Sequence, residues 1–160
     1  MSRKFLKEVL RSHDRIFSVI QSLETDLLTI LRDVSEIYNK EMSVIRHHLD
    51  IFLRIYEEEL SLHFKSEEEA IFPYAKDQSL VGDLIKEHVV ISDKIRELKK
   101  KREADPREAI DILKNIIKIL KQHILKENKL YNEMSEYLTI KEMNEIRERI
   151  KKIYGEDYSS

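Results

Sequence analysis

Hydrophobic residues in this chain recur every three or four positions rather than every second one. Over the first thirty residues this spacing is carried by an apolar series of ten residues: Phe5, Leu6, Val9, Leu10, Ile16, Phe17, Ile20, Leu23, Leu27 and Ile30. A period near 3.6 residues is that of a helix with one buried face, so the series predicts a helix over about residues 3–31. Further apolar and polar segments predict helices over about 41–72, 79–103 and 106–138, and a shorter helix over about 140–153. The fold class is therefore all-α.

Breaks between these segments carry the residues that begin or end helices. The polar stretch 33–40 is the first expected turn, and Pro73 ends the second helix because its ring cannot continue one. The segment Asp-Pro-Arg-Glu at 105–108 begins the fourth helix, with Asp as the cap, Pro in the first turn and Glu reaching back. Thr139 and Glu142 repeat this capping-box pattern at the start of the short last helix.

Short connections between long helices predict an up-down-up-down antiparallel four-helix bundle with a short fifth C-terminal helix. The 160 residues fit one core, so the whole chain, 1–160, is expected to be a single domain. Its ligand-bearing bundle would cover about 3–138. Only 2 Gly and 2 Pro leave little material for further turns.

The amino-acid composition excludes several classes of partner and of metal site. The net charge of −2 offers no basic excess to neutralise phosphates, so no nucleic-acid partner is expected. The absence of cysteine excludes disulfides and thiolate-bound metals, so a metal site must use histidines and carboxylates. The N-terminal residues mix charges into apolar positions, unlike a signal peptide, and no apolar run approaches the roughly 20 residues that span a bilayer. We expect a cytoplasmic protein with no membrane partner.

Four histidines fall on four different predicted helices, each on the apolar stripe of its helix. Two of them are followed four residues later by a glutamate, which points the same way from a helix. A carboxylate that faces a core is costly unless something pairs with it, so two of them indicate a cation inside. The six candidate metal ligands are His13, His63, Glu67, His88, His123 and Glu127.

Antiparallel folding is expected to bring all six residues to one level of the bundle. From the centre of the expected loop 74–78, which ends at Gln78, Glu67 lies about 9 residues back and His88 about 12 residues forward. From the turn near Asp105, His88 lies about 17 residues back and His123 about 18 forward. At roughly 1.5 Å per residue these mismatches amount to a turn or two.

Four imidazoles and two carboxylates suit two metal ions better than one. If both glutamates bridge, each ion has about four protein ligands, and iron, which prefers five or six, keeps positions for solvent, an oxo bridge, O₂ or NO. Mixed imidazole and carboxylate donors suit iron, manganese or zinc. The alternative, a bundle of buried and hydrogen-bonded histidines without metal, leaves the two inward carboxylates unexplained.

Neighbouring polar residues receive simpler interpretations. His48 faces a core stripe about 22 Å from His63 along the helix and is interpreted as a core or end-of-bundle histidine rather than a ligand. Glu68 and Glu69 are interpreted as surface charges. Asp14 either orients His13 or is exposed, and Tyr131 either hydrogen-bonds near the cluster or is a core aromatic.

Taken together, these motifs resemble the hemerythrin-like, or HHE cation-binding, family over about residues 5–138. The motifs that carry the resemblance are His13, His63-Phe64-x-x-Glu67-Glu68, Ile71-Phe72-Pro73, Glu87-His88 and His123-x-x-x-Glu127-x-x-Leu130-Tyr131. The resemblance implies a four-helix bundle with a non-haem di-iron centre: two iron ions joined by an oxo or hydroxo bridge, with manganese or zinc as alternatives. It implies that the four histidines are terminal ligands and that Glu67 and Glu127 bridge.

One departure from the oxygen-carrying hemerythrins stands out. Those proteins have a second histidine one turn after the third-helix histidine, where this chain has Ser92, and an aspartate five residues after the fourth-helix histidine. Here Glu127 follows His123 by four residues. The pattern is more similar to the branch that contains iron-centre repair proteins and an iron-sensing ubiquitin-ligase subunit, although the cysteine-bearing domain and the F-box of those proteins are not in this sequence. We expect a free-standing module.

The functional expectation is a di-iron protein that binds a small diatomic ligand, O₂ or NO, or that senses or holds iron. A second hypothesis is an enzyme or iron donor that acts on NO or peroxide or repairs damaged iron centres. A third is a helical scaffold whose metal is purely structural. Binding or sensing is favoured over turnover because no docking motif for an electron partner is present.

Overall fold

A computed structural model describes residues 38–155 and, before them, residues 7, 11, 17, 18, 21, 22, 24 and 25, which are helical. The described residues contain helices and no strands, which confirms the all-α class. The helix expected over 3–31 and its ligand candidate His13 fall mainly outside the described residues, so they remain predictions, as does the complete four-helix arrangement.

The second predicted helix, 41–72, is a nearly continuous helical rod that changes its winding twice. It starts as α2 (Tyr38–Ile55), widens into a π turn (Tyr56–Leu60), returns to α3 (Ser61–Ser66) and widens again over Glu67–Ile71. A 3-10 turn, Phe72–Tyr74, then ends it, with Pro73 inside that turn. The predicted extent was nearly correct, and the two π turns within it were not predicted.

The third and fourth predicted helices match their expected bounds to within a residue. Helix α4 spans Gln78–Ala104 and helix α5 spans Pro106–Tyr137. The Asp105 side chain caps α5 by accepting a hydrogen bond from the backbone N–H of Glu108 at 3.3 Å. The Glu108 side chain, expected to complete a capping box, forms an ion pair with Lys101 instead, at 3.1 Å.

Helix α6 (Ile140–Tyr154) begins with the expected capping box. The backbone N–H of Glu142 donates to Thr139 Oγ1, and the backbone N–H of Thr139 donates to the Glu142 carboxylate, both at 3.1 Å. Such a box satisfies two backbone donors that have no partner inside the helix. The sequence therefore fixes where α6 starts.

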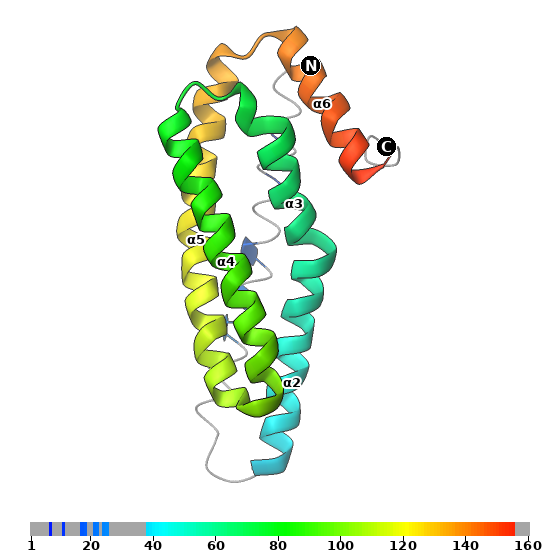
Figure 1. The fold of residues 1–160 in the computed structure, drawn as a ribbon, viewed down its shortest axis with the longest axis vertical. Helices are drawn as coiled ribbons and strands as arrows, with labels where there is room; N and C mark the ends of the chain where they lie inside the picture. Colours follow the sequence, from blue (N-terminus) through cyan, green and yellow to red (C-terminus); the bar gives the residue numbers. More distant parts are fainter. Residues whose placement is uncertain are drawn as a thin grey trace.

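The long helices lie side by side and alternate in direction (Figure 1). The rod of α2 and α3 ends at the turn before α4, α4 descends alongside α5, and α6 turns away beyond the top of α5. A single residue, Asp105, separates α4 from α5, and these two helices pack against each other as antiparallel neighbours.

The apolar interior consists of two clusters stacked along the helices. The lower cluster contains Ile45, Leu49 and Phe52 of α2 with Phe64 of α3 and Ile91 of α4. The upper cluster brings the residues after the second π turn together with α6. Its buried members are Ala70, Ile71, Phe72, Ala75, Val81, Leu84, Leu130, Tyr131, Met134, Met143, Ile146 and Ile150. The polar candidate ligands lie where one cluster gives way to the other, between or directly beside their members in the sequence.

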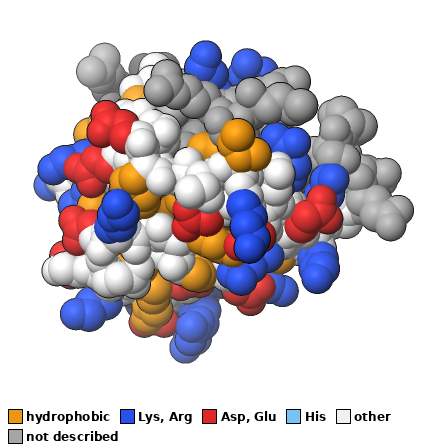
Figure 2. Space-filling model, turned by 90° about the horizontal axis from the view of Figure 1, so that it is seen from above, with side chains coloured by type: hydrophobic (Ala, Val, Ile, Leu, Met, Phe, Trp, Pro, Cys, Tyr) orange, Lys and Arg blue, Asp and Glu red, His pale blue; other side chains and the backbone are white. Residues whose placement is uncertain are grey.

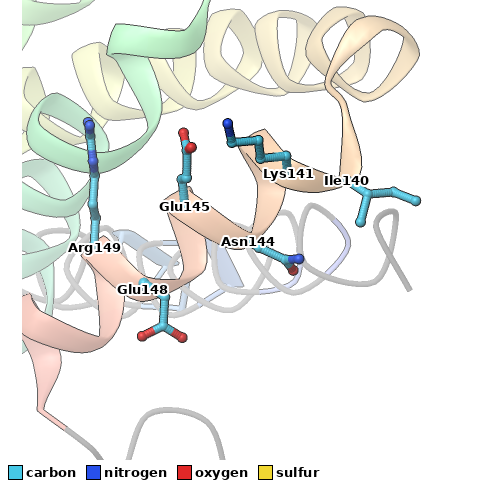
Figure 3. A pocket seen from close by; sticks show the side chains of 6 residues that line it. All are labelled: Ile140, Lys141, Asn144, Glu145, Glu148 and Arg149. Atoms are coloured by element: carbon cyan, nitrogen blue, oxygen red, sulfur yellow. The ribbon is translucent and has the colours of Figure 1, made fainter.

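Helix α6 covers the upper cluster with one face and is fixed to the 3-10 turn by polar contacts. Tyr74 donates a hydrogen bond to the Glu145 carboxylate at 2.8 Å, and the Arg149 guanidinium lies 5.0 Å from the centre of the Tyr74 ring. Figure 3 shows Glu145 and Arg149 on the same side of α6, with Glu148 on the opposite side. This arrangement orients the buried face of α6 toward the bundle.

Charged side chains of both signs are interspersed on the end of the molecule seen in Figure 2, with apolar side chains between them. Neither sign dominates this face, in keeping with the small net charge. Among the helices described, none combines the length and apolarity needed to cross a membrane.

Candidate metal centre

Four of the six predicted ligands meet in the layer between the two apolar clusters. Glu67, His88, His123 and Glu127 each offer one ligand atom, and these atoms all lie within 4.8 Å of one another. The four residues are between 0% and 3% exposed. They come from three segments: the second π turn, α4 and α5.

Of the other two predicted ligands, His63 and His13, only His63 is among the described residues. His63 on α3 is buried, and its Nε2 lies 3.2 Å from Oε1 of Glu67, one turn along the same helix. His13 lies outside the described residues. His48 is half-buried in α2 and is not part of the group of four, in keeping with its interpretation as a core or end-of-bundle histidine.

The His88 imidazole lies at the centre of the group. Its Nε2 atom is 2.9 Å from Nε2 of His123, 3.3 Å from Oε1 of Glu127 and 3.7 Å from Oε1 of Glu67. Nε2 of His123 also contacts the Glu127 carboxylate on the next turn of α5. Each carboxylate therefore lies between a histidine of its own helix and one from α4.

The second π turn starts at Glu67 itself. The backbone N–H of Glu67 donates to the carbonyls of both His63 and Phe64, and the buried Ser66 hydroxyl donates to the His63 carbonyl at 2.7 Å. A π turn places more residues in one revolution than an α turn does. Glu67, Ala70 and Ile71 are the buried residues of this turn, so the candidate ligand lies on the same face as two core residues.

Burial makes the charge of Glu67 costly. Removal from water, and then the adjacent Glu127 carboxylate, raise the pKa of Glu67 well above its usual range. Tyr131, one turn beyond Glu127, opposes this rise by donating its hydroxyl to Oε2 of Glu67. Burial and the two carboxylates raise the pKa of Tyr131 well above 10, so this hydroxyl keeps its proton. Of the two alternatives for Tyr131, the hydrogen bond to the cluster is the one observed.

The far side of the His123 ring contacts a residue that the sequence analysis assigned no role. Oε2 of Glu87 lies 2.9 Å from Nδ1 of His123, and Oε1 of Glu87 pairs with Lys126. Burial lowers the pKa of His123, but the hydrogen bonds with Glu127 and Glu87 outweigh it and raise that pKa overall. Because Glu87 and His123 are on different helices, no spacing within one helix could reveal this contact.

The far side of the His88 ring has a looser carboxylate neighbour. Nδ1 of His88 lies 3.5 Å from Oε1 of Glu68, and the ring stacks on Phe64 with 4.0 Å between ring centres. The Glu68 side chain is 36% exposed, so Glu68 is a partly exposed charge that also lies close to a candidate ligand, a contact that the sequence did not predict. Glu69 is exposed, as expected.

A cleft between α3 and α4 leads from the surface to His88. It encloses about 300 Å³ and is lined by Tyr56, Ser61, Phe64, Lys65, Glu68, His88, Val89, Ser92 and Arg96. The hydroxyls of Tyr56 and Ser92 are hydrogen-bonded across it at 3.1 Å. A larger hollow of about 620 Å³ lies along α6 (Figure 3), and the described residues that line it all belong to α6, so none of them is a candidate ligand.

Comparison with known protein families gives one match. The family model of the hemerythrin HHE cation binding domain matches residues 4–135, most of the chain. The chain belongs to this family. No curated protein and no solved structure matches the sequence significantly.

The donor set of this hemerythrin HHE domain fits a cation. Two carboxylates with almost no exposure lie side by side in a layer that interrupts an otherwise apolar interior. Without a cation, either one of the two carboxylates binds a proton or the two negative charges repel each other. Imidazole nitrogens converge on the same space, which is the ligand chemistry of iron, manganese and zinc. The family match and this cluster together indicate metal binding.

Proposed function

We propose that this protein holds two iron ions in its buried His/Glu layer and binds a diatomic ligand there, O₂ or NO. The observation that carries the proposal is the convergence of Glu67, His88, His123 and Glu127 within 4.8 Å. When present, a pair of ferrous ions supplies open coordination positions and reducing equivalents for such a ligand.

The roles of the side chains follow from their neighbours. Glu67 and Glu127 would be shared between the ions, because each lies between a histidine of its own helix and His88. His63, His88 and His123 would be terminal ligands. We propose that the helix predicted over 3–31 completes an up-down-up-down bundle and contributes His13 as the fourth terminal histidine.

The structure offers a route for a small ligand. The cleft between α3 and α4 contains the His88 ring in its wall, and the hydrogen-bonded Tyr56 and Ser92 hydroxyls also belong to its lining. Its volume of about 300 Å³ is ample for a diatomic molecule to approach His88. Phe64, stacked on His88, keeps the inner end of this route apolar.

The test is anaerobic purification from iron-replete cells, followed by metal analysis and optical spectra before and after addition of O₂ or NO. We expect about two iron atoms per chain and a reversible spectral change upon addition of the ligand. Glu127→Ala should lose both, while His47→Ala, at an exposed position of α2, should keep them.

Two outcomes would overturn the proposal. One zinc ion per chain with no near-ultraviolet absorption of a ferric centre would support the structural-metal hypothesis instead. Continuous consumption of O₂ or NO in the presence of a reductant would support the enzyme hypothesis.

A further inference from the structure

A chain of polar contacts runs from the buried layer to the surface of the molecule. It starts at the His123 ring, which has no exposure, passes through the Glu87 carboxylate and ends at the Lys126 ammonium. The side chains of Glu87 and Lys126 are 20% and 48% exposed. Glu87 belongs to α4, and the other two belong to α5.

The direction of the first hydrogen bond follows from the chemistry of the two groups. An ionised carboxylate only accepts, so Nδ1 of His123 must carry the proton that it donates across 2.9 Å. A neutral imidazole with its proton on Nδ1 has a free electron pair on Nε2. That pair faces the layer, since Nε2 is the atom that contacts His88 and Glu127.

Lys126 fixes the other end of this arrangement. Its ammonium pairs with Oε1 of Glu87, the oxygen that His123 does not use. The carboxylate is thus held from both sides and cannot turn toward solvent without breaking one of the two contacts. Lys126 directly precedes Glu127, so the same turn of α5 carries both a candidate ligand and the residue that holds Glu87.

The surroundings of His88, the other histidine in the group of four, can be compared with those of His123. The carboxylate nearest to its Nδ1 is that of Glu68, at 3.5 Å, which is longer than a good hydrogen bond between nitrogen and oxygen. Within the described part of the chain, no lysine or arginine forms an ion pair with Glu68 in the way that Lys126 does with Glu87. Of the two rings, His123 is therefore the one held by a complete set of partners.

We propose that Glu87 is a positioning residue for metal binding, which holds His123 in the tautomer and orientation that a metal ion requires, and that Lys126 anchors it. The inference rests on the proposed metal-binding function of the cluster, but not on which metal is bound. Loss of a hydrogen-bonding partner behind a metal-bound histidine typically weakens metal affinity about 10–100-fold.

The test compares Co²⁺ binding to the chelated full-length protein and to three variants, Glu87→Ala, Glu87→Gln and Glu69→Gln. The visible absorption of Co²⁺ reports the number and type of its ligands, and competition with a chelator gives the affinity. We expect Glu87→Ala to bind about 10–100-fold more weakly with an altered spectrum. Glu87→Gln should recover part of the affinity because its amide oxygen still accepts from Nδ1. Glu69→Gln removes an equal charge at an exposed position nearby and should match the wild type.

Thermal unfolding of the metal-free proteins separates positioning from a structural role. The metal-free Glu87→Gln variant should melt close to the wild type, because its amide oxygen still accepts from Nδ1 of His123 and the ion pair that it loses with Lys126 is partly exposed, a kind of pair that contributes little to stability. Wild-type affinity in Glu87→Ala, or an equal loss in Glu69→Gln, would overturn the inference. If the wild-type protein itself bound no Co²⁺, the proposed metal-binding function would be wrong. If the wild type and Glu87→Ala bound Co²⁺ equally well, only the proposed role of Glu87 would be wrong.

Discussion

Replacement of Glu67 by glutamine should stabilise the metal-free protein while it abolishes metal binding. The ligand oxygens of Glu67 and Glu127 lie within 4.8 Å of each other, in a layer with almost no exposure. Two unit charges at that distance repel each other by about 3.5 kcal/mol at an effective dielectric constant of about 20. A neutral amide of nearly the same shape removes that repulsion and still accepts the Tyr131 hydroxyl.

The expected gain is smaller than the full repulsion, because the wild-type pair relieves part of it by binding a proton. We expect the metal-free Glu67→Gln protein to be more stable than the wild type by about 1–3 kcal/mol at pH 7. For a chain of this size, that corresponds to a rise in melting temperature of roughly 3–10 °C. With metal present the order should reverse, since only the wild type gains stability from binding.

The pH dependence gives a sharper test. Burial and Glu127 raise the pKa of Glu67 above its ordinary value of 4.5. Stability associated with its protonated form is fully present below that value and is lost as the pH rises through the higher folded-state pKa. The two proteins should therefore melt alike near pH 4, and the advantage of Glu67→Gln should appear and grow above pH 4.5.

The assay is thermal unfolding by circular dichroism in the presence of a chelator across this pH range, with Glu69→Gln as the control at an exposed position. If metal-free Glu67→Gln melted at or below the melting temperature of the wild type at every pH, while Glu69→Gln stayed unchanged, the buried carboxylate pair would not destabilise the metal-free protein. The layer would then have no electrostatic need for a bound cation.

Three further predictions concern metal content, capping and charge pairing. Glu127→Ala should lose most of its iron by elemental analysis, whereas His48→Ala should keep wild-type content because it is outside the cluster. Thr139→Ala removes the α6 cap and should cost about 1 kcal/mol in denaturant unfolding without changing the metal content. The Arg102 guanidinium lowers the pKa of Asp50, so Asp50→Asn should lose at most about 1 kcal/mol at neutral pH, given its exposure. That difference is present above about pH 4 and should vanish as the pH falls through the folded-state pKa of Asp50, as measured by unfolding at a series of pH values.

The sequence predicts the helices that begin and end with strong local patterns. Asp105 and Thr139 cap α5 and α6 as expected, because a cap involves residues only three positions apart. It also predicts which residues meet in the layer: counting residues from the turns placed Glu67, His88 and His123 at one level, and the structure brings them together. These inferences need only helix geometry and short connections.

The π turns were not predictable in the same way. Their effect is to change the winding of the rod by about one residue, while the apolar spacing of three or four positions remains compatible with an α-helix. The sequence pattern therefore gave no sign of either π turn. The contact between Glu87 and His123 was missed for another reason, since it joins two helices and depends on their rotation about their own axes.

The polar layer divides the interior into a lower and an upper apolar cluster, and both clusters contain residues of α4 and α5. Each cluster alone resembles the core of a smaller protein. The boundary between the two clusters consists of carboxylates that repel each other and of imidazoles and carboxylates that compete for protons when no cation is bound. The layer is thus a point at which folding cooperativity can be interrupted. We expect backbone amides at the two ends of α5 to exchange hydrogen with different free energies in chelated protein and with one shared value once metal is bound. A bound cation would then join two halves into one unfolding unit, in addition to any role in binding a ligand.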